Sequence, residues 1–322
     1  MTVNARKVIA AAIAAVACIA ANPALAFPDK TVRIVVPFAP GGATDVVARA
    51  LAARLAPIWK QQVIIENKPG AGGNIGADLV AKAPNDGHTL LLASPAEVVI
   101  NSLLYKSMPY DPQKDLAPVA KIASAPLALV VHPSVPAKNM AELLAYLKAN
   151  PGTPYASSGT GGPQHLAGEW FRSLTKTDIT HVPYKGGAPA IIDLLGGQVK
   201  MFFSGLPPSI QHIQAGRLRV IAISTAAPSS LMEGVPPVAA TVPGFDVENW
   251  QGLFAPAGTP PAVIAKVAAD AARVAQDKSY QDQLKASGAA PAVLAPEAFN
   301  AFLDSERRKY RELVQISGAK AD

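Results

Sequence analysis

The sequence contains a single cysteine, Cys18, in an N-terminal stretch that we expect to be removed. The remaining chain then has no thiol, which excludes disulfides, thiolate nucleophiles and cysteine-ligated metals. Charge is also sparse, because charged residues make up 16% of the chain and the lysines and arginines are scattered. Such a pattern is typical of an ordinary solvated surface, so we expect no nucleic acid as a partner.

The N-terminus has the pattern of a secretory signal peptide. Arg6-Lys7 precedes 14 consecutive apolar residues, Val8–Ala21, and Ala24-Leu25-Ala26 precedes Phe27. Fourteen residues is short for a membrane span, so we predict that residues 1–26 are cleaved off near Ala26. An uncleaved anchor and lipidation at Cys18, in the sequence AVAC, are the alternatives.

Beyond residue 26 the sequence has no other apolar segment long enough to suggest a membrane span. We therefore expect an exported protein whose location is the periplasm. Residues 1–26 carry two positive charges and no negative charge, so their removal lowers the formal net charge from +6 to +4. This mild positive charge gives a weak preference for anionic ligands.

Short β-like runs alternate with amphipathic helical patterns, which predicts an α/β fold with a mostly parallel sheet. The expected helices include Thr44–Ile58, Met140–Ala149, Pro261–Asp277 and Pro296–Ile316. The expected strands are Val32–Pro37, Gln62–Glu66, Thr89–Ala93, Ala128–Val131, Tyr155–Ser158, Thr180–Pro183, Met201–Phe203, Val220–Ser224 and Gly252–Ala255.

Two proline-rich shifts, at Ser124–Leu127 and Thr225–Pro237, mark the expected crossings between two lobes. The first lobe would comprise residues 27–125 and 230–322. The second lobe, inserted into the first, would comprise residues 126–229.

At four points an expected strand runs directly into an expected helix: Phe38–Asp45, Ser94–Glu97, Gly159–His165 and Lys185–Pro189. Ser94 and Glu97 also have the spacing of a capping box. Unpaired amides and the positive end of the helix dipole favour an anion at each junction, and ligands of open α/β sheets bind at this edge. With two junctions in each lobe, an anionic ligand would be held from both sides. An ordinary tight turn is the alternative for any one junction taken alone.

Known enzyme motifs are absent. The glycine-rich GAGGNIG at 70–76 has Ile75 where a dinucleotide fingerprint needs glycine, and no P-loop lysine follows it. Ser157 and Ser158 do not lie in a G-x-S-x-G elbow, and the five histidines show no H-x-x-x-H spacing. We therefore expect no catalytic residue, no metal site and no cofactor.

Several side chains near the junctions have two open roles. His165 could donate to a carboxylate or could cap and pack, and Lys185 could add charge to the cleft or extend into solvent. Asp45 could offset the helix dipole and organise its loop. Phe38 and Trp250 could line the site or pack in the core.

Five segments carry a resemblance to a known family: FPDKTVRIVVPFAPGGATDVVARALAARL, VIIENKPGAGGNIGADLVAKAPNDGHTLLL, GTGGPQHLAGEWF, HVPYKGGAPAIIDLLGGQV and LFAPAGTP. They resemble the Bug family, the extracytoplasmic solute-binding receptors of tripartite tricarboxylate transporters. The resemblance covers essentially all of the chain after residue 26, in the expected order. It implies a two-lobed periplasmic-binding-protein fold, type II-like, with a ligand cleft between lobes that close by a hinge motion, and no catalysis.

The resemblance also implies a small organic carboxylate as the ligand, held by main-chain groups and two ordered waters on the loop after the first strand. The implied partners are the permease subunits of a tripartite transporter, and we expect a monomer. The expected ligand-binding residues are Phe38, Ala39, Gly41, Gly42, Thr44, Asp45, Ser94, Ser158, Thr160, Gly161, His165, Lys185, Gly186 and Ser204.

One departure from the family pattern bears on the ligand. Family members often have GGQVD followed by FDN, whereas this chain reads GGQVKMFFSG, with Lys200 and Ser204 at the usually acidic positions. If Ser204 faces the ligand, an ammonium group has no acidic partner there, so we expect a carboxylate that is not an amino acid. Two other function classes remain open: an exported sensor that presents its ligand to a membrane kinase, and an enzyme that acts on a carboxylate.

Overall fold

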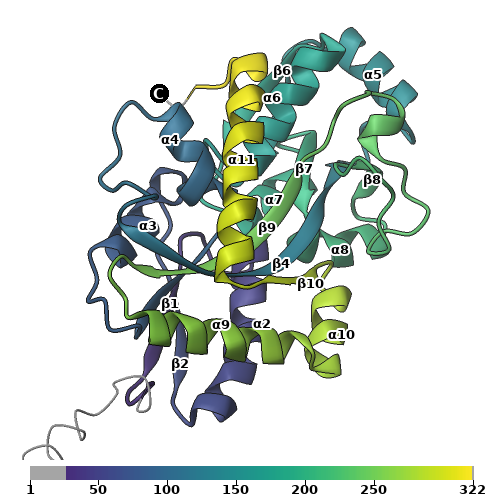
Figure 1. The fold of residues 1–322 in the computed structure, drawn as a ribbon. Helices are drawn as coiled ribbons and strands as arrows, with labels where there is room; N and C mark the ends of the chain where they lie inside the picture. Colours follow the sequence, from purple (N-terminus) through teal and green to yellow (C-terminus); the bar gives the residue numbers. More distant parts are fainter. Residues whose placement is uncertain (1–26, 321–322) are drawn as a thin grey trace, which may run out of the picture.

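The computed structural model describes residues 27–320, so the predicted signal peptide lies outside the described residues. Within that range the chain forms a mixed α/β structure around one curled sheet (Figure 1). No helix in residues 27–320 is both long and apolar enough to cross a bilayer.

The sheet has ten strands in the described part of the chain, in the order β2-β1-β3-β9-β4-β7-β5-β6, with β8 and β10 also paired to β4. The nine predicted strands are present, β3 with the predicted ends and the other eight with shifted ends, and β10 was not predicted. The strands are β1 (Val32–Val36), β2 (Val63–Asn67), β3 (Thr89–Ala93), β4 (Leu116–Val131), β5 (Thr153–Ser157), β6 (Ile179–Pro183), β7 (Met201–Gly205), β8 (Arg219–Ile223), β9 (Glu248–Pro256) and β10 (Ala290–Leu294).

The expectation of a mostly parallel sheet is wrong. β1 pairs in parallel with β2 and β3, and β5 pairs in parallel with β6 and β7. The pairs that involve β4 or β9 are all antiparallel. Two parallel groups are therefore joined by an antiparallel centre, which the alternation of strands and helices along the sequence does not reveal.

β4 joins the two groups of strands. Its first part pairs with β9 as far as Pro126↔Glu248, and its last part, Leu127–Val131, pairs with β7. We call β1, β2, β3, β9, β10 and the first part of β4 the first lobe, and β5 to β8 with the end of β4 the second lobe. Because β4 is continuous across both groups, the sheet itself connects the lobes (Figure 1).

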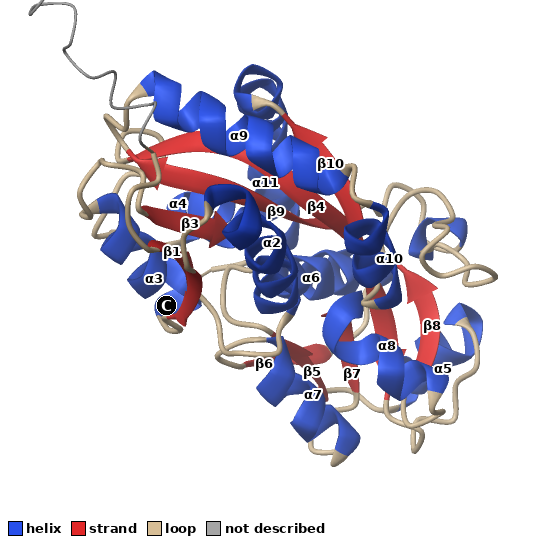
Figure 2. Cartoon of the chain, turned by 90° about the horizontal axis from the view of Figure 1, so that it is seen from below, coloured by secondary structure: helices blue, strands red, loops and turns tan. Residues whose placement is uncertain are grey.

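The helices cover both faces of this sheet (Figure 2). They are α2 (Ala43–Trp59), α3 (Asn74–Ala81), α4 (Asn101–Leu104), α5 (Met140–Ala149), α6 (Pro163–Thr175), α7 (Gly187–Leu195), α8 (Leu206–Gln214), α9 (Pro261–Ala275), α10 (Lys278–Ala286) and α11 (Pro296–Ser317). Single-turn segments are η2 (Ala71–Gly73), the π-helix η3 (Ala96–Ile100) and η4 (Val238–Ala240).

Apolar side chains of α2, α9 and α10 form one core with the first lobe, represented by Leu51, Val267 and Leu284. On the other face, α11 packs Phe299 and Tyr310 into a core that continues into the second lobe. Burying each such large side chain stabilises the fold by about 1.5–3 kcal/mol. These cores hold the strand ends, and hence the junction loops, in place.

The segment between β8 and β9 packs on the second lobe. Phe245 stacks on Trp170 at a centroid distance of 5.1 Å and on Phe203 at 5.5 Å. The sequence-based division at residue 230 assigns Phe245 to the first lobe. We propose Glu248, where β9 begins, as the boundary that fits these contacts.

Candidate ligand-binding site

The loop after β1 is shaped by glycine and held by Asp45. Gly41 has φ +80°, a conformation that glycine adopts without strain. The Asp45 carboxylate accepts hydrogen bonds from the Gly41 amide, Arg49 and Asn67, each at 2.9 Å. Burial opposes ionisation of Asp45, yet these hydrogen bonds outweigh it and hold its pKa below the usual value. Asp45 therefore organises the loop from behind.

A small cavity lies where the four predicted junctions meet, and we call it the junction cavity. Its volume is about 20 Å³, which fits one or two water-sized groups. Every predicted junction contributes to its wall, and Asn249 of β9 completes it. It is lined by Phe38, Gly42, Ala43, Thr44, Ser94, Ser158, Gln164, Gly187 and Asn249.

The helices that begin at this cavity have no side-chain caps. The N-cap residues of α2, α6 and α7 are Gly42, Gly162 and Gly186, and none provides a side-chain hydrogen bond to the first turn. α5 and α10 are capped by Asn139 and Asp277, whereas α3, α4, α8, α9 and α11 also lack a side-chain cap. The feature that α2, α6 and α7 share is that residues of their starts line one cavity. The first-turn amides of these helices that no side chain caps, together with the positive ends of three helix dipoles, suit a carboxylate.

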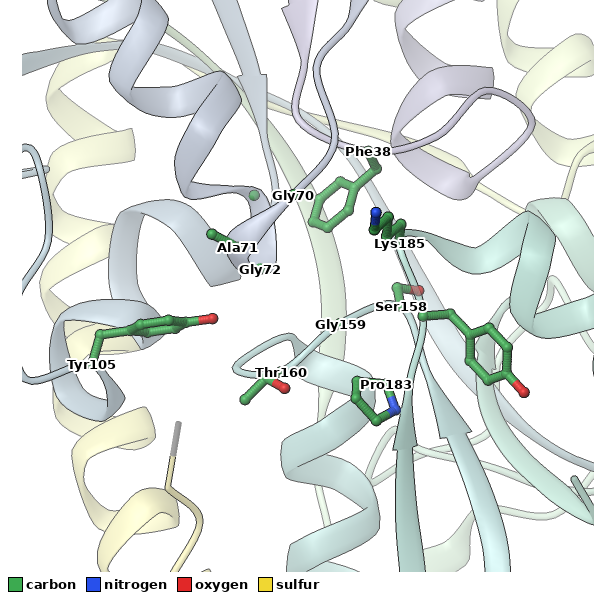
Figure 3. Close-up of a pocket in the computed structure, with 12 residues that line it drawn as sticks. Phe38, Gly70, Ala71, Gly72, Tyr105, Ser158, Gly159, Thr160, Pro183 and Lys185 are labelled. Atoms are coloured by element: carbon green, nitrogen blue, oxygen red, sulfur yellow. The ribbon is translucent and has the colours of Figure 1, made fainter. Parts of the chain in front are cut away.

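A larger cavity of about 230 Å³ adjoins the first, and we call it the loop cavity (Figure 3). The two cavities share Phe38 and Ser158. The loop cavity is lined by Phe38, Gly70, Ala71, Gly72, Gly73, Tyr105, Ser158, Gly159, Thr160, Pro183, Tyr184 and Lys185.

Tyr105 gives the loop cavity a directed polar group. Its hydroxyl points into the space between Gly72 and Thr160 (Figure 3). Burial raises the pKa of Tyr105, so the phenol stays protonated at neutral pH and can donate a hydrogen bond. With the hydroxyls of Ser158 and Thr160 and the Lys185 side chain in the same wall, the cavity suits a second polar or anionic group of a ligand.

The glycine-rich loop GAGGNIG, rejected as a nucleotide motif, forms one wall of the loop cavity. Gly70, Ala71, Gly72 and Gly73 all have positive φ, and α3 begins at Asn74. These residues were not among the predicted ligand-binding residues, because the segment was compared only with the glycine spacing of nucleotide-binding motifs. The signal was a fifth strand-to-helix junction, between β2 and α3.

The two lobes touch across the cavities. The Ala39 amide donates a hydrogen bond to the Lys185 carbonyl at 3.2 Å. A Cβ at Gly72 would lie 2.5 Å from the Thr160 carbonyl oxygen, and one at Gly186 would lie 3.1 Å from the Ala39 nitrogen. Glycine is therefore required at Gly72 for this approach of the two backbones.

The predicted site residues fall into two groups. Phe38, Gly42, Thr44, Ser94, Ser158, Thr160 and Lys185 line a cavity. Ala39, Gly41, Asp45, Gly161, His165, Gly186 and Ser204 are not part of either wall; several of them support the loops from behind. A direct ligand contact of any of these residues stays a prediction.

His165 caps and packs. Its Nδ1 accepts a hydrogen bond from the Gly161 amide at 3.1 Å, and its ring stacks on His181 at 3.9 Å. Burial, with a smaller effect of Arg172, lowers the pKa of His165 to about 4, so the ring is neutral at neutral pH. His181 in turn lies 2.6 Å from the Ser157 hydroxyl, and neither residue lines a cavity.

Ser204 and Trp250 are both buried, and neither lines one of the two cavities. The Ser204 hydroxyl donates to the Gly205 carbonyl at 2.9 Å and is not exposed to either cavity. Ser204 therefore gives no reason to prefer a ligand without an amino group. Trp250 donates to Glu306 at 2.7 Å and packs against Phe299 in the core.

No group of three or more histidine, aspartate or glutamate side chains in residues 27–320 is arranged to hold a metal ion. The cavity walls are built from backbone, hydroxyl, amide and aromatic groups with one lysine. Such walls can bind the anionic group of a ligand in one cavity and orient the rest of the ligand in the other.

A fold of two α/β lobes with a binding cavity between them defines the class of periplasmic solute-binding proteins. The profile of the TctC family, described as tripartite tricarboxylate transporter family receptor, matches residues 47–318. The chain belongs to this family, and its resemblance to the Bug proteins is confirmed.

A curated relative, protein BugT of Bordetella pertussis, is 39% identical over 241 residues, covering 74% of each chain. Among solved structures, R. palustris Rpa4515 with adipate has a TM-score of 0.89 at 35% identity and covers 91% of this chain and 99% of its own. MatC (Rpa3494) from Rhodopseudomonas palustris with bound malate has a TM-score of 0.84 at 32% identity and covers 89% of this chain and 100% of its own.

Proposed function

We propose that the protein is a periplasmic receptor that captures a small organic carboxylate between its lobes and delivers it to the membrane permease of a tripartite transporter. The observation that carries the proposal is the convergence of three uncapped helix starts, from both lobes, on the junction cavity. An anion there gains from both lobes only when they are closed together, so binding would favour closure.

The ligand would place one carboxylate in the junction cavity and extend into the loop cavity. A second polar group would meet Tyr105, Thr160 and Lys185 there. The ligands of the two R. palustris structures, adipate and malate, are both dicarboxylates. We therefore propose a carboxylate with a distal polar or anionic group.

Neither cavity wall, as described, includes an aspartate or glutamate side chain. An ammonium group would be desolvated there without a carboxylate partner, which is costly. The composition of the two walls, in place of Ser204, therefore favours a carboxylate that is not an amino acid.

The test is a thermal-shift screen of monocarboxylates, dicarboxylates, tricarboxylates, aromatic acids and amino acids. A ligand at 100 times its Kd should add about 2.7 kcal/mol of stability. Dicarboxylates should raise the Tm most and amino acids least. If no carboxylate raises the Tm, the proposal fails.

A transport role and a sensor role differ in the partner. We propose the permease, because the family is that of the transporter receptors. The check is a pull-down of the liganded protein from membranes. Recovery of a membrane kinase in place of permease subunits would overturn this part of the proposal.

A further inference from the structure

Glu97 is a fully buried carboxyl group directly behind the junction cavity. It lies in η3, immediately after β3, with an exposed fraction of 0%. Its carboxylate accepts hydrogen bonds from the Ser94 amide at 2.8 Å and from the Ser94 hydroxyl at 3.1 Å. Ser94 itself lines the junction cavity, so a single serine separates Glu97 from the place proposed for the ligand.

Glu97 also lies against the loop cavity. A Cβ at Gly73, a residue of that wall, would meet the Glu97 carboxylate, so the carboxyl group presses against the glycine-rich loop. It thus sits behind both cavities without being exposed in either.

No cation offsets the negative charge that Glu97 carries when it is ionised. Burial is the largest influence on Glu97, and its own amide and Ser94 are the only groups that oppose it. Burial therefore raises the pKa of Glu97 to about 8. Of the segments packed against η3, α4, η2 and β3 carry no titratable side chain. The charged or titratable residues of α11 are Glu297, Asp304, Glu306, Arg307, Arg308, Lys309, Tyr310, Arg311 and Glu312. None of them contributes to the pKa of Glu97, and neither does Tyr110, whose hydroxyl donates to the Glu97 carbonyl.

The Ser94 hydroxyl can serve only one acceptor at a time. Its oxygen accepts from the Ala96 amide at 3.3 Å, and while Glu97 is ionised the single hydroxyl proton of Ser94 is donated to the Glu97 carboxylate. If Glu97 carries a proton, the carboxyl group donates to Ser94 Oγ, and the serine proton is released toward the cavity. Protonation of Glu97 would therefore turn Ser94 into a donor for the ligand.

We infer that binding of a carboxylate in the junction cavity is coupled to uptake of one proton by Glu97, which acts through Ser94 as a positioning residue. The inference rests on the proposed function. Two carboxylates on either side of one serine cannot both be ionised without repulsion, so the ligand favours the neutral form of Glu97. The proton comes from solvent, and no bond other than O–H is made or broken.

The proposed coupling makes the affinity for the ligand fall as the pH rises. Ligand binding raises the pKa of Glu97 above its value in the free protein. Below the free-protein value Glu97 is already neutral, so the affinity is highest and constant there. Above it, each bound ligand must draw in a proton, so Kd rises with pH, by up to about tenfold per pH unit.

The experiment is isothermal titration calorimetry of the purified protein with adipate, or with the acid that gives the largest thermal shift, at pH 7 and pH 9. Each titration is run in two buffers of different ionisation enthalpy, because the difference in heat counts protons. We expect roughly half to one proton taken up per ligand at pH 9 and about a tenth at pH 7.

The variant Glu97→Gln carries a permanently neutral side chain whose amide can donate to Ser94. It should bind with an affinity within about threefold of the wild type at pH 7, independent of pH, and take up no proton. Glu306→Gln is the matched control. Glu306 is a buried acid on α11 that pairs with Lys309 and Trp250, so this variant should keep the wild-type proton uptake.

Three outcomes would overturn the inference. Binding of a carboxylate with no buffer-dependent heat at pH 9 would do so while leaving the receptor proposal intact. Uptake that persists in Glu97→Gln would assign the proton to another group. If Glu97→Gln does not fold, the buffer dependence of the wild type decides alone. Failure of every acid in the thermal-shift screen would overturn both proposals together.

Discussion

The junction cavity and the loop cavity share Phe38 and Ser158 but are built from different parts. The junction cavity is small and made mostly from backbone at helix starts and from short side chains. The loop cavity is about ten times larger and carries Tyr105, Lys185 and a glycine-rich loop with unusual backbone. The first suits any carboxylate, whereas the second can distinguish one carboxylate from another.

We expect the junction cavity to select carboxylates as a class and the loop cavity to select among carboxylates. Backbone amides cannot tell one acid from another, because every carboxylate presents the same two oxygens. Side chains that contact the ligand away from its carboxylate can distinguish one acid from another by the length and polarity of the rest of the ligand. Changes in the junction cavity should therefore weaken all ligands, and changes in the loop cavity should alter the order of preference.

The largest effect is expected from filling the junction cavity. A Cβ at Gly187 has ordinary contacts, 3.5 Å or longer, and points toward Ser158. Gly187→Leu should therefore fold but block the ligand, raising Kd for every acid by about 100-fold or more, ~2.7 kcal/mol. Calorimetry measures this. Gly196→Leu, at the other end of α7 with equally free space, is the control and should bind normally.

A smaller loss of ligand affinity is expected when a substitution holds the lobes apart. Gly72→Ala places a methyl group 2.5 Å from the Thr160 carbonyl oxygen of the other lobe, so closure should be impeded and Kd should rise about 30-fold for all acids. Gly216→Ala has the same backbone strain, φ +67° against +64°, but open space. Both variants should lose similar stability in a thermal melt, and loss of binding in Gly216→Ala as well would contradict the role of closure.

Removal of the Tyr105 hydroxyl should act on some ligands only. Tyr105→Phe should weaken adipate about tenfold, the value of a hydrogen bond to a charged group, and leave hexanoate unchanged. Tyr184→Phe is the control, because that hydroxyl donates to Asp193 at 2.7 Å. Equal losses for adipate and hexanoate in competition assays would place the distal end of the ligand elsewhere.

The smallest effect is expected at Lys185, whose side chain is exposed. Lys185→Met should weaken adipate about threefold at low salt and less at high salt, because exposed ion pairs are weak and screened. Titrations at two salt concentrations measure this. A loss that does not depend on salt would indicate lost packing in place of lost charge.

The sequence predicted much of this arrangement. The four strand-to-helix junctions were visible as apolar runs that end in glycine or proline before an amphipathic pattern, and all four line the junction cavity. The helices Pro261–Ala275 and Met140–Ala149 begin where the periodicity indicated. These features are local, so a single sequence carries them.

Other features depend on distant parts of the chain. β4 was predicted only as Ala128–Val131, and Ser124–Leu127 was interpreted as a crossing between lobes. The strand instead begins at Leu116 and includes Pro118 and Pro126 in a bulged, antiparallel ladder. β10 contains two alanines and a proline and shows no strand pattern. Tyr105 and Asn249 reach the cavities only through tertiary packing. Sequence periodicity has no signal for such contacts.

The central claim is that a carboxylate is held by helix starts from both lobes. The most direct measurement is a crystal structure of the protein with the acid that raises its Tm most. We predict one carboxylate in the junction cavity within hydrogen-bonding distance of amides of α2 and α7, directly or through water, and the distal end beside Tyr105. A carboxylate bound to one lobe only, or outside the two cavities, would contradict the account.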